Sequence, residues 1–154
     1  MNQNQPPLWF PLIFMIVGLL VMLVGVGIIP VIPESVHGPL WLLTTFGLMF
    51  LSAGLGLLAM SGEKGEDSLA RHILQWIALT ITIGSFSTLF LWVGFGPGER
   101  EFSGGLSLGP LSFGQSGNEM IGRCMFGGFG LFAALMALYF FVTKLWQIVD
   151  LIAR

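Results

Sequence analysis

Residues 124–143 read CMFGGFGLFAALMALYFFVT, twenty residues in which no side chain carries a charge. A helix needs about 20 apolar residues to cross the roughly 30 Å of hydrocarbon in a bilayer. Three further stretches are comparably long and apolar. Together the four cover about residues 8–31, 39–60, 73–95 and 124–143. The sequence therefore predicts an all-α membrane protein with four transmembrane helices.

The composition of the whole chain agrees with this class. Of 154 residues, 55% are hydrophobic and 9% are charged, whereas soluble proteins have about 25% charged residues. This length fits one four-span domain over residues 1–154. The first apolar stretch exceeds the roughly 7–15 residues of a signal-peptide core and lacks a basic flank, so we expect it to remain as a span. The net charge of −2 provides no basic surface for nucleic acid.

Two short connections predict that the spans form two hairpins. Residues 33–39, PESVHGP, are bounded by prolines, which end one helix and suit the first turn of the next. Residues 61–68, SGEKGEDS, are charged and glycine-rich, and they end in an Asp-Ser pair that suits the start of a helix.

The third connection, residues 97–118, is longer and contains six glycines and four serines. So many helix breakers predict a loop. It forms either a small hairpin or flap at the membrane surface, or a simple polar loop. Asn118 is expected to cap the fourth helix, with Glu119 near the positive end of the helix dipole.

The basic residues predict the orientation, because Lys and Arg near span ends are retained on the cytoplasmic side. Four lie on the side shared by the two termini: Lys64, Arg71, Lys144 and Arg154. Arg100 and Arg123 lie on the other side. Both termini are therefore expected in the cytoplasm and the loop 97–118 outside, in a multi-pass protein of a bacterial cytoplasmic (inner) membrane.

Small residues mark the predicted packing faces of the helices, because helices in lipid associate where their backbones approach closely. The candidates for helix packing are Gly127, Gly130, Ala134 and Ala137 in the fourth span, and Ser52 and Gly56 in the second. Gly18 and Gly25 lie seven residues apart in the first. These faces are expected to pack in a four-helix bundle.

Hydroxyl side chains of the third span form a second group of candidates. Thr80, Ser87 and Thr88 fall along one side of the predicted helix. They either belong to the packing faces, or line a polar path or contact a partner helix.

Charged residues beside the outer loop form a third group. Glu119 and Arg123 are four residues apart and lie on the same side of the helix. Arg123 is expected to be an interfacial anchor. Alternatively, Arg123 or Arg100 fastens the outer loop over the bundle, or contacts an anionic headgroup or a partner.

In residues 144–154 the apolar and the polar side chains fall on opposite sides of a helix. This pattern predicts that the fourth span continues as a short amphipathic C-terminal helix at the cytoplasmic surface. This helix either rests at the headgroups or docks on a larger partner.

No pattern in the chain indicates a catalytic, cofactor-binding or metal site. Cys124, His37 and His72 are too few for a structural zinc site, and the predicted topology separates the two histidines by about the bilayer thickness. The middle of each span lacks a carboxylate, which proton-coupled carriers usually need there.

Two functional hypotheses follow, and a third, a lipid-modifying or quinone-linked enzyme, is disfavoured because no catalytic group is placed at depth. The first is a small, non-catalytic accessory or scaffold subunit of a larger membrane protein complex, whose partners are membrane lipids and other membrane protein subunits. The alternative is a self-associating channel or carrier for a small neutral solute.

Overall fold

The computed structural model describes residues 7–30, 38–61, 69–98 and 115–153, and the regular structure in these ranges is helical. The helices are α1 (Trp9–Gly25), α2 (Trp41–Met60), α3 (Leu69–Phe95) and α4 (Gln115–Ala153). This confirms the all-helical fold. Three helices, α2, α3 and the part Glu119–Val149 of α4, are long and apolar enough to cross a membrane.

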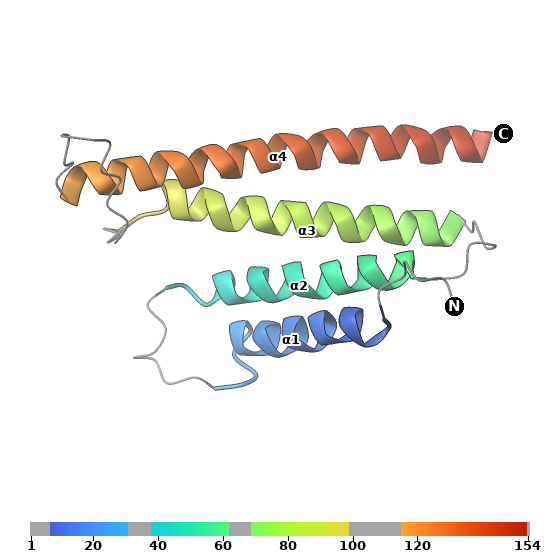
Figure 1. The fold of residues 1–154 in the computed structure, drawn as a ribbon, viewed down its shortest axis with the longest axis horizontal. Helices are drawn as coiled ribbons and strands as arrows, with labels where there is room; N and C mark the ends of the chain where they lie inside the picture. Colours follow the sequence, from blue (N-terminus) through green and yellow to red (C-terminus); the bar gives the residue numbers. More distant parts are fainter. Residues whose placement is uncertain (1–6, 31–37, 62–68, 99–114, 154) are drawn as a thin grey trace.

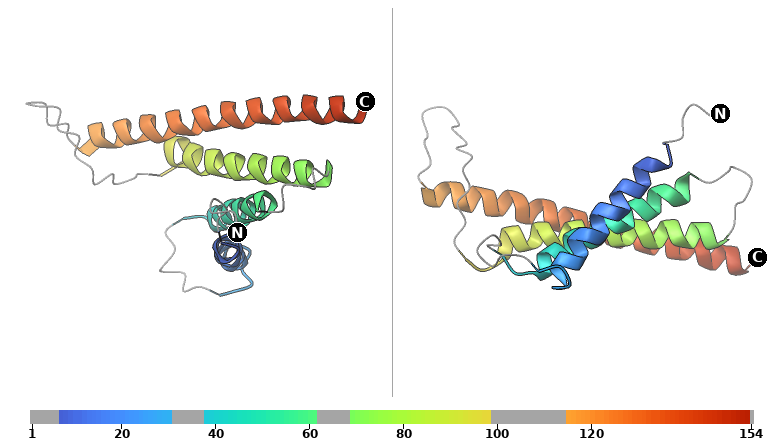
Figure 2. Two further views of the ribbon diagram at one scale, coloured as in Figure 1. Left: turned by 45° about the vertical axis from the view of Figure 1, so that its right-hand side comes forward. Right: turned by 90° about the horizontal axis from the view of Figure 1, so that it is seen from below.

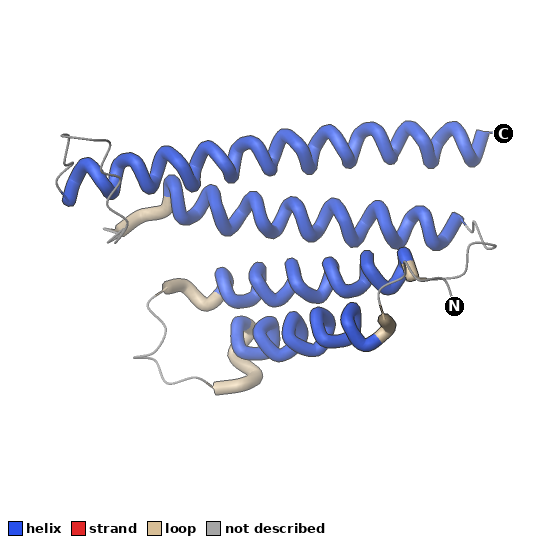
Figure 3. Tube along the Cα trace, in the orientation of Figure 1, coloured by secondary structure: helices blue, strands red, loops and turns tan. Residues whose placement is uncertain are grey.

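The four helices lie side by side in chain order, as Figure 1 shows. Within the described ranges, α1 packs on α2, α2 on α3 and α3 on α4, while helices that do not follow one another make no contact. Figure 2 shows that the row is twisted, because α1 and α4 run at different inclinations. Figure 3, which colours the chain by secondary structure, shows the same row of helices. The helical bundle is therefore an open row, in which α2 and α3 each lie between two neighbours.

Helix α1 is shorter than the predicted span of residues 8–31. It has 17 residues, about 26 Å at 1.5 Å per residue. The chain leaves the helix at Gly27, whose φ is +79°. The amide of Gly27 donates to the carbonyl of Val24 (3.0 Å) and that of Ile28 to Leu23 (2.9 Å), the bond pattern of a glycine-terminated helix end. Hydrophobicity alone does not predict this end of α1, because the residues after Gly27 are also apolar.

Helix α4 is longer than predicted. Its 39 residues extend about 58 Å, roughly twice the hydrocarbon thickness. The segment 144–153 continues α4 without a break, in agreement with the predicted helical extension of the fourth span, because neither glycine nor proline occurs after Gly130. At the other end α4 begins at Gln115, so Asn118 is already inside the helix and the predicted cap is wrong.

The predicted loop 97–118 is correspondingly shorter. Residues 115–118 are helical, and residues 97 and 98 follow the end of α3. The rest of the loop, predicted as a hairpin, a flap or a polar loop, lies outside the described residues. The two shorter predicted connections also fall mostly outside them, although α3 begins at Leu69, directly after the Asp-Ser pair.

Glycines on both helices produce the contact between α1 and α2. A Cβ added to Gly18 would lie 2.7 Å from the carbonyl oxygen of Gly47, and one added to Gly47 would lie 2.5 Å from the backbone nitrogen of Met22. A Cβ on Gly54 would lie 2.8 Å from the carbonyl oxygen of Pro11. The two backbones are therefore too close for any side chain at these positions.

The two middle helices each carry contact residues on two opposite sides. Gly47 of α2 faces α1, whereas Gly56, nine residues later, lies against Ala78 of α3. On α3, Ser87 follows Ala78 by nine residues and bonds to α4. Nine residues turn a helix by about 180°. Opposite contact sides on α2 and α3 are what place the four helices in a row.

We predict that Gly47→Ala destabilises the pair of α1 and α2, because the added methyl group meets the Met22 backbone and the helices have to move apart. Overpacking of this kind costs about 1–3 kcal/mol. Gly128→Ala is the matched control, since a Cβ there has no neighbour within 4 Å. Heating the purified protein in detergent, followed by circular dichroism, should give a lower midpoint for Gly47→Ala only. Equal midpoints for the two variants would contradict the close contact.

Candidate functional site

The predicted small-residue face of α4 lies against α3. A Cβ on Gly127 would lie 2.9 Å from the ring of Phe95, and a Cβ on Gly130 would lie 2.7 Å from the backbone nitrogen of Leu91. Both glycines are buried, and Ala134 and Ala137 on the same face are half-buried. Gly127 and Gly130 therefore occupy the contact between α3 and α4, whereas packing of Ala134 and Ala137 there stays a prediction.

Ser52 and Gly56, the candidates on α2, lie against α3. Ser52 is 3% exposed, and its hydroxyl shares a hydrogen bond of 2.9 Å with the hydroxyl of Thr82. The Ser52 hydroxyl also lies 3.0 Å from the carbonyl oxygen of Met49, and that of Thr82 lies 2.7 Å from the carbonyl oxygen of Ala78. Because each hydroxyl has one proton, one of the two donates across the contact and the other donates to its own helix. The contact thus combines close packing with a hydrogen bond between two helices in the apolar part of the protein.

Three further contact glycines were not among the sequence candidates. Gly47 and Gly54 face α1, and a Cβ on Gly94 of α3 would collide with the backbone of Gly127. Gly47 and Gly54 are seven residues apart, the same spacing as Gly18 and Gly25 on α1. That repeated spacing is the signal that could have identified them.

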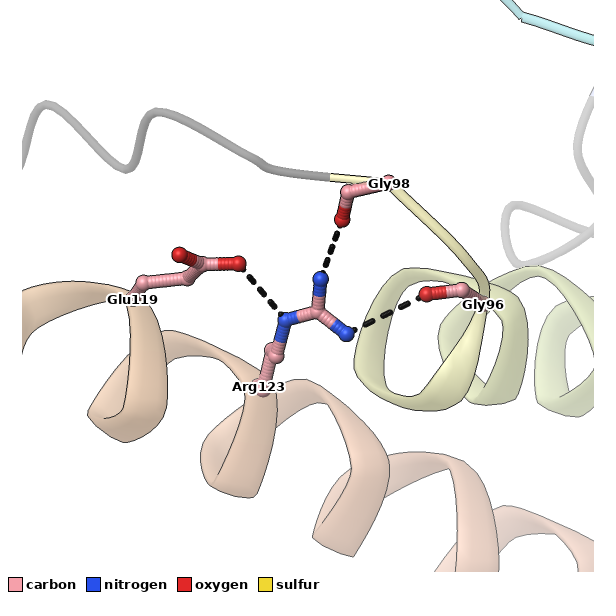
Figure 4. Close-up of polar contacts among 4 residues, drawn as sticks. All are labelled: Gly96, Gly98, Glu119 and Arg123. Carbon is pink, nitrogen blue, oxygen red and sulfur yellow. Dashed lines mark hydrogen bonds and ion pairs between the residues drawn. The ribbon is translucent and has the colours of Figure 1, made fainter. Parts of the chain in front are cut away.

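Arg123 joins the beginning of α4 to the end of α3 (Figure 4). Its Nε donates to Oε1 of Glu119 at 2.9 Å. Its Nη1 donates to the carbonyl oxygen of Gly96 at 3.2 Å, and its Nη2 donates to that of Gly98. The side chains of Arg123 and Glu119 are each 29% exposed. We call these four residues the Arg123 cluster.

The local sequence explains why these carbonyls are available. Helix α3 ends at Phe95, and Pro97 has no N–H with which to continue it. Gly98 has a φ of +102°, a conformation that favours glycine. The carbonyls of Gly96 and Gly98 follow the end of α3, outside its helical hydrogen bonds and near the negative end of its dipole, so a guanidinium group suits them.

The preceding hairpin uses an arginine in the same way. Arg71, near the start of α3, donates through Nε to the carbonyl of Ala59 near the end of α2 (2.7 Å). Gln75 donates to the same carbonyl at 3.1 Å. In both hairpins, a basic residue early in one helix therefore binds carbonyls at or just after the C-terminal end of the helix before it.

The Arg123 cluster bears on the predictions for the charged candidates. Gly98 opens the predicted outer loop, so Arg123 makes the kind of contact that fastening of this loop requires. Arg100 lies outside the described residues. Contact of either arginine with an anionic headgroup or a partner stays a prediction.

The three hydroxyl candidates of α3 differ in their surroundings. Ser87, 4% exposed, donates to the carbonyl of Gly130 at 2.8 Å. Thr88 is exposed and donates to Gly84 of its own helix at 2.9 Å. The buried hydroxyl oxygen of Thr80 has no hydrogen-bond partner among the described residues. Ser87 thus serves the contact with α4, and the three hydroxyls do not form one line along a path within this chain.

No protein-family model, curated protein or solved structure matches the chain. Its function is therefore inferred from the geometry of the helices and from the chemistry of their exposed surfaces.

We predict that Arg123→Gln lowers the stability of the hairpin of α3 and α4, because the carbonyls of Gly96 and Gly98 lose a charged donor. Hydrogen bonds to charged groups contribute about 1.5–3 kcal/mol, and partial exposure places the expected loss near the lower value. Arg123→Lys should be intermediate, since an ammonium group keeps the charge but lacks the planar fork of donors. Unfolding of the purified variants in detergent by added dodecyl sulfate measures the order. A Gln variant as stable as the unchanged protein would contradict the role of the cluster.

Proposed function

We propose that this protein is a small, non-catalytic accessory or scaffold subunit of a larger membrane protein complex. The observation that supports the proposal is the open row of helices. In the three segments long enough to cross a membrane, the buried share is 17% for α2, 22% for α3 and 17% for α4. Few residues even of the two middle helices are thus fully buried, and their partly exposed surfaces are available to lipid and to other membrane subunits.

The chemistry of the uncovered surfaces agrees with this proposal. Large apolar side chains are exposed on all four helices, for example Ile16 on α1, Phe46 on α2, Phe86 on α3 and Phe132 on α4. Within the described helices, the charged residues lie toward the helix ends. Such surfaces suit contact with acyl chains and apolar helices. They offer little to a polar solute, for which a lone row of helices encloses no path.

We further propose that the chain crosses the inner membrane of a bacterial cell four times and that both termini lie in the cytoplasm. The start of α1 and the end of α4 lie on the same side of the molecule, at the right in Figure 1. Arg71 and Lys144 lie toward that side of the molecule, and Arg123 lies toward the opposite side. The side with more basic residues is the one assigned to the cytoplasm, where such residues are retained. A membrane adapts to a helix a few ångströms too short by local thinning, so the length of α1 is compatible with a crossing.

Labelling of single cysteines tests this topology. In the background Cys124→Ser, which removes the chain's one cysteine, the variants are Gln3→Cys, Ser35→Cys, Glu66→Cys and Ser107→Cys. A membrane-impermeant maleimide should label positions 35 and 107 in intact cells, and positions 3 and 66 only after lysis. If positions 3 and 35 label together in intact cells, α1 does not cross the membrane.

Purification from the native membrane tests the proposed function. We predict that the tagged chain, extracted in a mild detergent, retains other membrane subunits in fixed stoichiometry, which mass spectrometry identifies. A preparation from cells that carry the tag alone controls for adhering proteins. Recovery of the chain as a defined oligomer of itself would contradict the accessory role. It would favour the channel or carrier, for which reconstituted flux is the next measurement.

A further inference from the structure

A groove of about 830 Å³ lies on one broad face of the row, between α2 and α4. Its floor is the part of α3 from His72 to Thr82, and its walls come from Ala53–Met60 of α2 and Lys144–Ile148 of α4. No Cα atoms of α2 and α4 lie within 8 Å of each other, so among the described helices α3 lies between them at the bottom of the groove. The ten residue steps from His72 to Thr82 give the floor a length of about 15 Å.

The chemistry of the groove changes along its length. Toward the middle of the helices its lining is mainly apolar, with Ala53, Leu79 and one hydroxyl residue, Thr82. The end formed by the beginning of α3 and the late part of α4 adds the side chains His72, Gln75, Lys144 and Gln147. The groove is thus mainly apolar toward the middle of the helices and more polar toward the beginning of α3. An amphiphilic lipid in one leaflet of a membrane has the same order of apolar and polar parts.

Lys144 gives the polar end its charge. Its ammonium group donates one hydrogen bond to Oε1 of Gln147 at 2.8 Å, and an ammonium group has three donors. The described lining of the groove includes no carboxylate. The charge of this end therefore matches an anion.

We propose that the groove binds one anionic phospholipid, with the phosphate at Lys144 and an acyl chain along the floor made by α3. The volume lies within the roughly 300–1,000 Å³ of ordinary ligand sites. A basic residue at the headgroup level attracts anionic lipid. This proposal does not rest on the accessory role, because it concerns the chain's own surface.

Competition between two lipids tests the proposal. The purified protein in mild detergent receives equimolar phosphatidylglycerol and phosphatidylcholine with identical acyl chains, and native mass spectrometry counts the lipids that remain bound. We expect about fivefold more retained phosphatidylglycerol, the ratio that one basic residue near a membrane surface produces. Equal retention of the two lipids would overturn the proposal.

Variants separate the charge from the groove. Lys144→Gln should bring the ratio close to one, and Lys144→Arg should keep it. Ala53→Phe should reduce retention of both lipids by filling the groove, whereas Leu58→Phe should not, because Leu58 is exposed on the same helix but does not line the groove. The midpoints of thermal unfolding identify variants that fold normally, and only these are compared. A preference unchanged in Lys144→Gln, or retention unchanged in Ala53→Phe, would overturn the assignment to this groove.

Discussion

Close approach of helix backbones is the constraint on which this structure depends. In lipid, two apolar helices gain little by exchanging acyl chains for each other, so packing contacts and hydrogen bonds have to hold them together. At Gly18 and Gly47 the backbones of α1 and α2 leave no room for a Cβ, and at Gly94 of α3 the backbone of Gly127 in α4 does the same. Absent side chains thus allow many atoms of two helices to reach contact distance, where each gains a small attraction.

The contact between α2 and α3 uses a different device. Gly56 and Ala78 lie at ordinary contact distance there, because a Cβ added to Gly56 would be 3.4 Å from the Cβ of Ala78. Hydrogen bonds supplement the packing. The hydroxyls of Ser52 and Thr82 meet in the apolar part, and Arg71 binds the carbonyl of Ala59 at one end. The rings of Trp41 and Trp92 meet edge to face at the other end, with centroids 6.1 Å apart. Polar bonds and aromatic packing therefore take the place of backbone proximity at this contact.

The sequence predicts single helices better than it predicts their ends and partners. The apolar run 39–60 nearly coincides with α2, because hydrophobicity and helix length are properties of the segment itself. The end of α1 depends on the conformation of Gly27, which hydrophobicity does not reflect. The contact of Arg123 with Gly96 and Gly98 depends on the path of the chain after α3. The groove joins residues of three helices, and no spacing within one segment could indicate it.

The spacing of the contact residues in the sequence nevertheless corresponds to the arrangement in a row. Gly47 and Gly56, like Ala78 and Ser87, are nine residues apart, and this separation places them on opposite sides of their helices. Small residues at right angles would instead have turned the row into a closed bundle. The same opposition explains the groove, because α2 and α4 attach to opposite sides of α3 and leave its broad face between them. No helix of the described chain covers this surface, and its mainly apolar lining suits acyl chains or the apolar side of another helix.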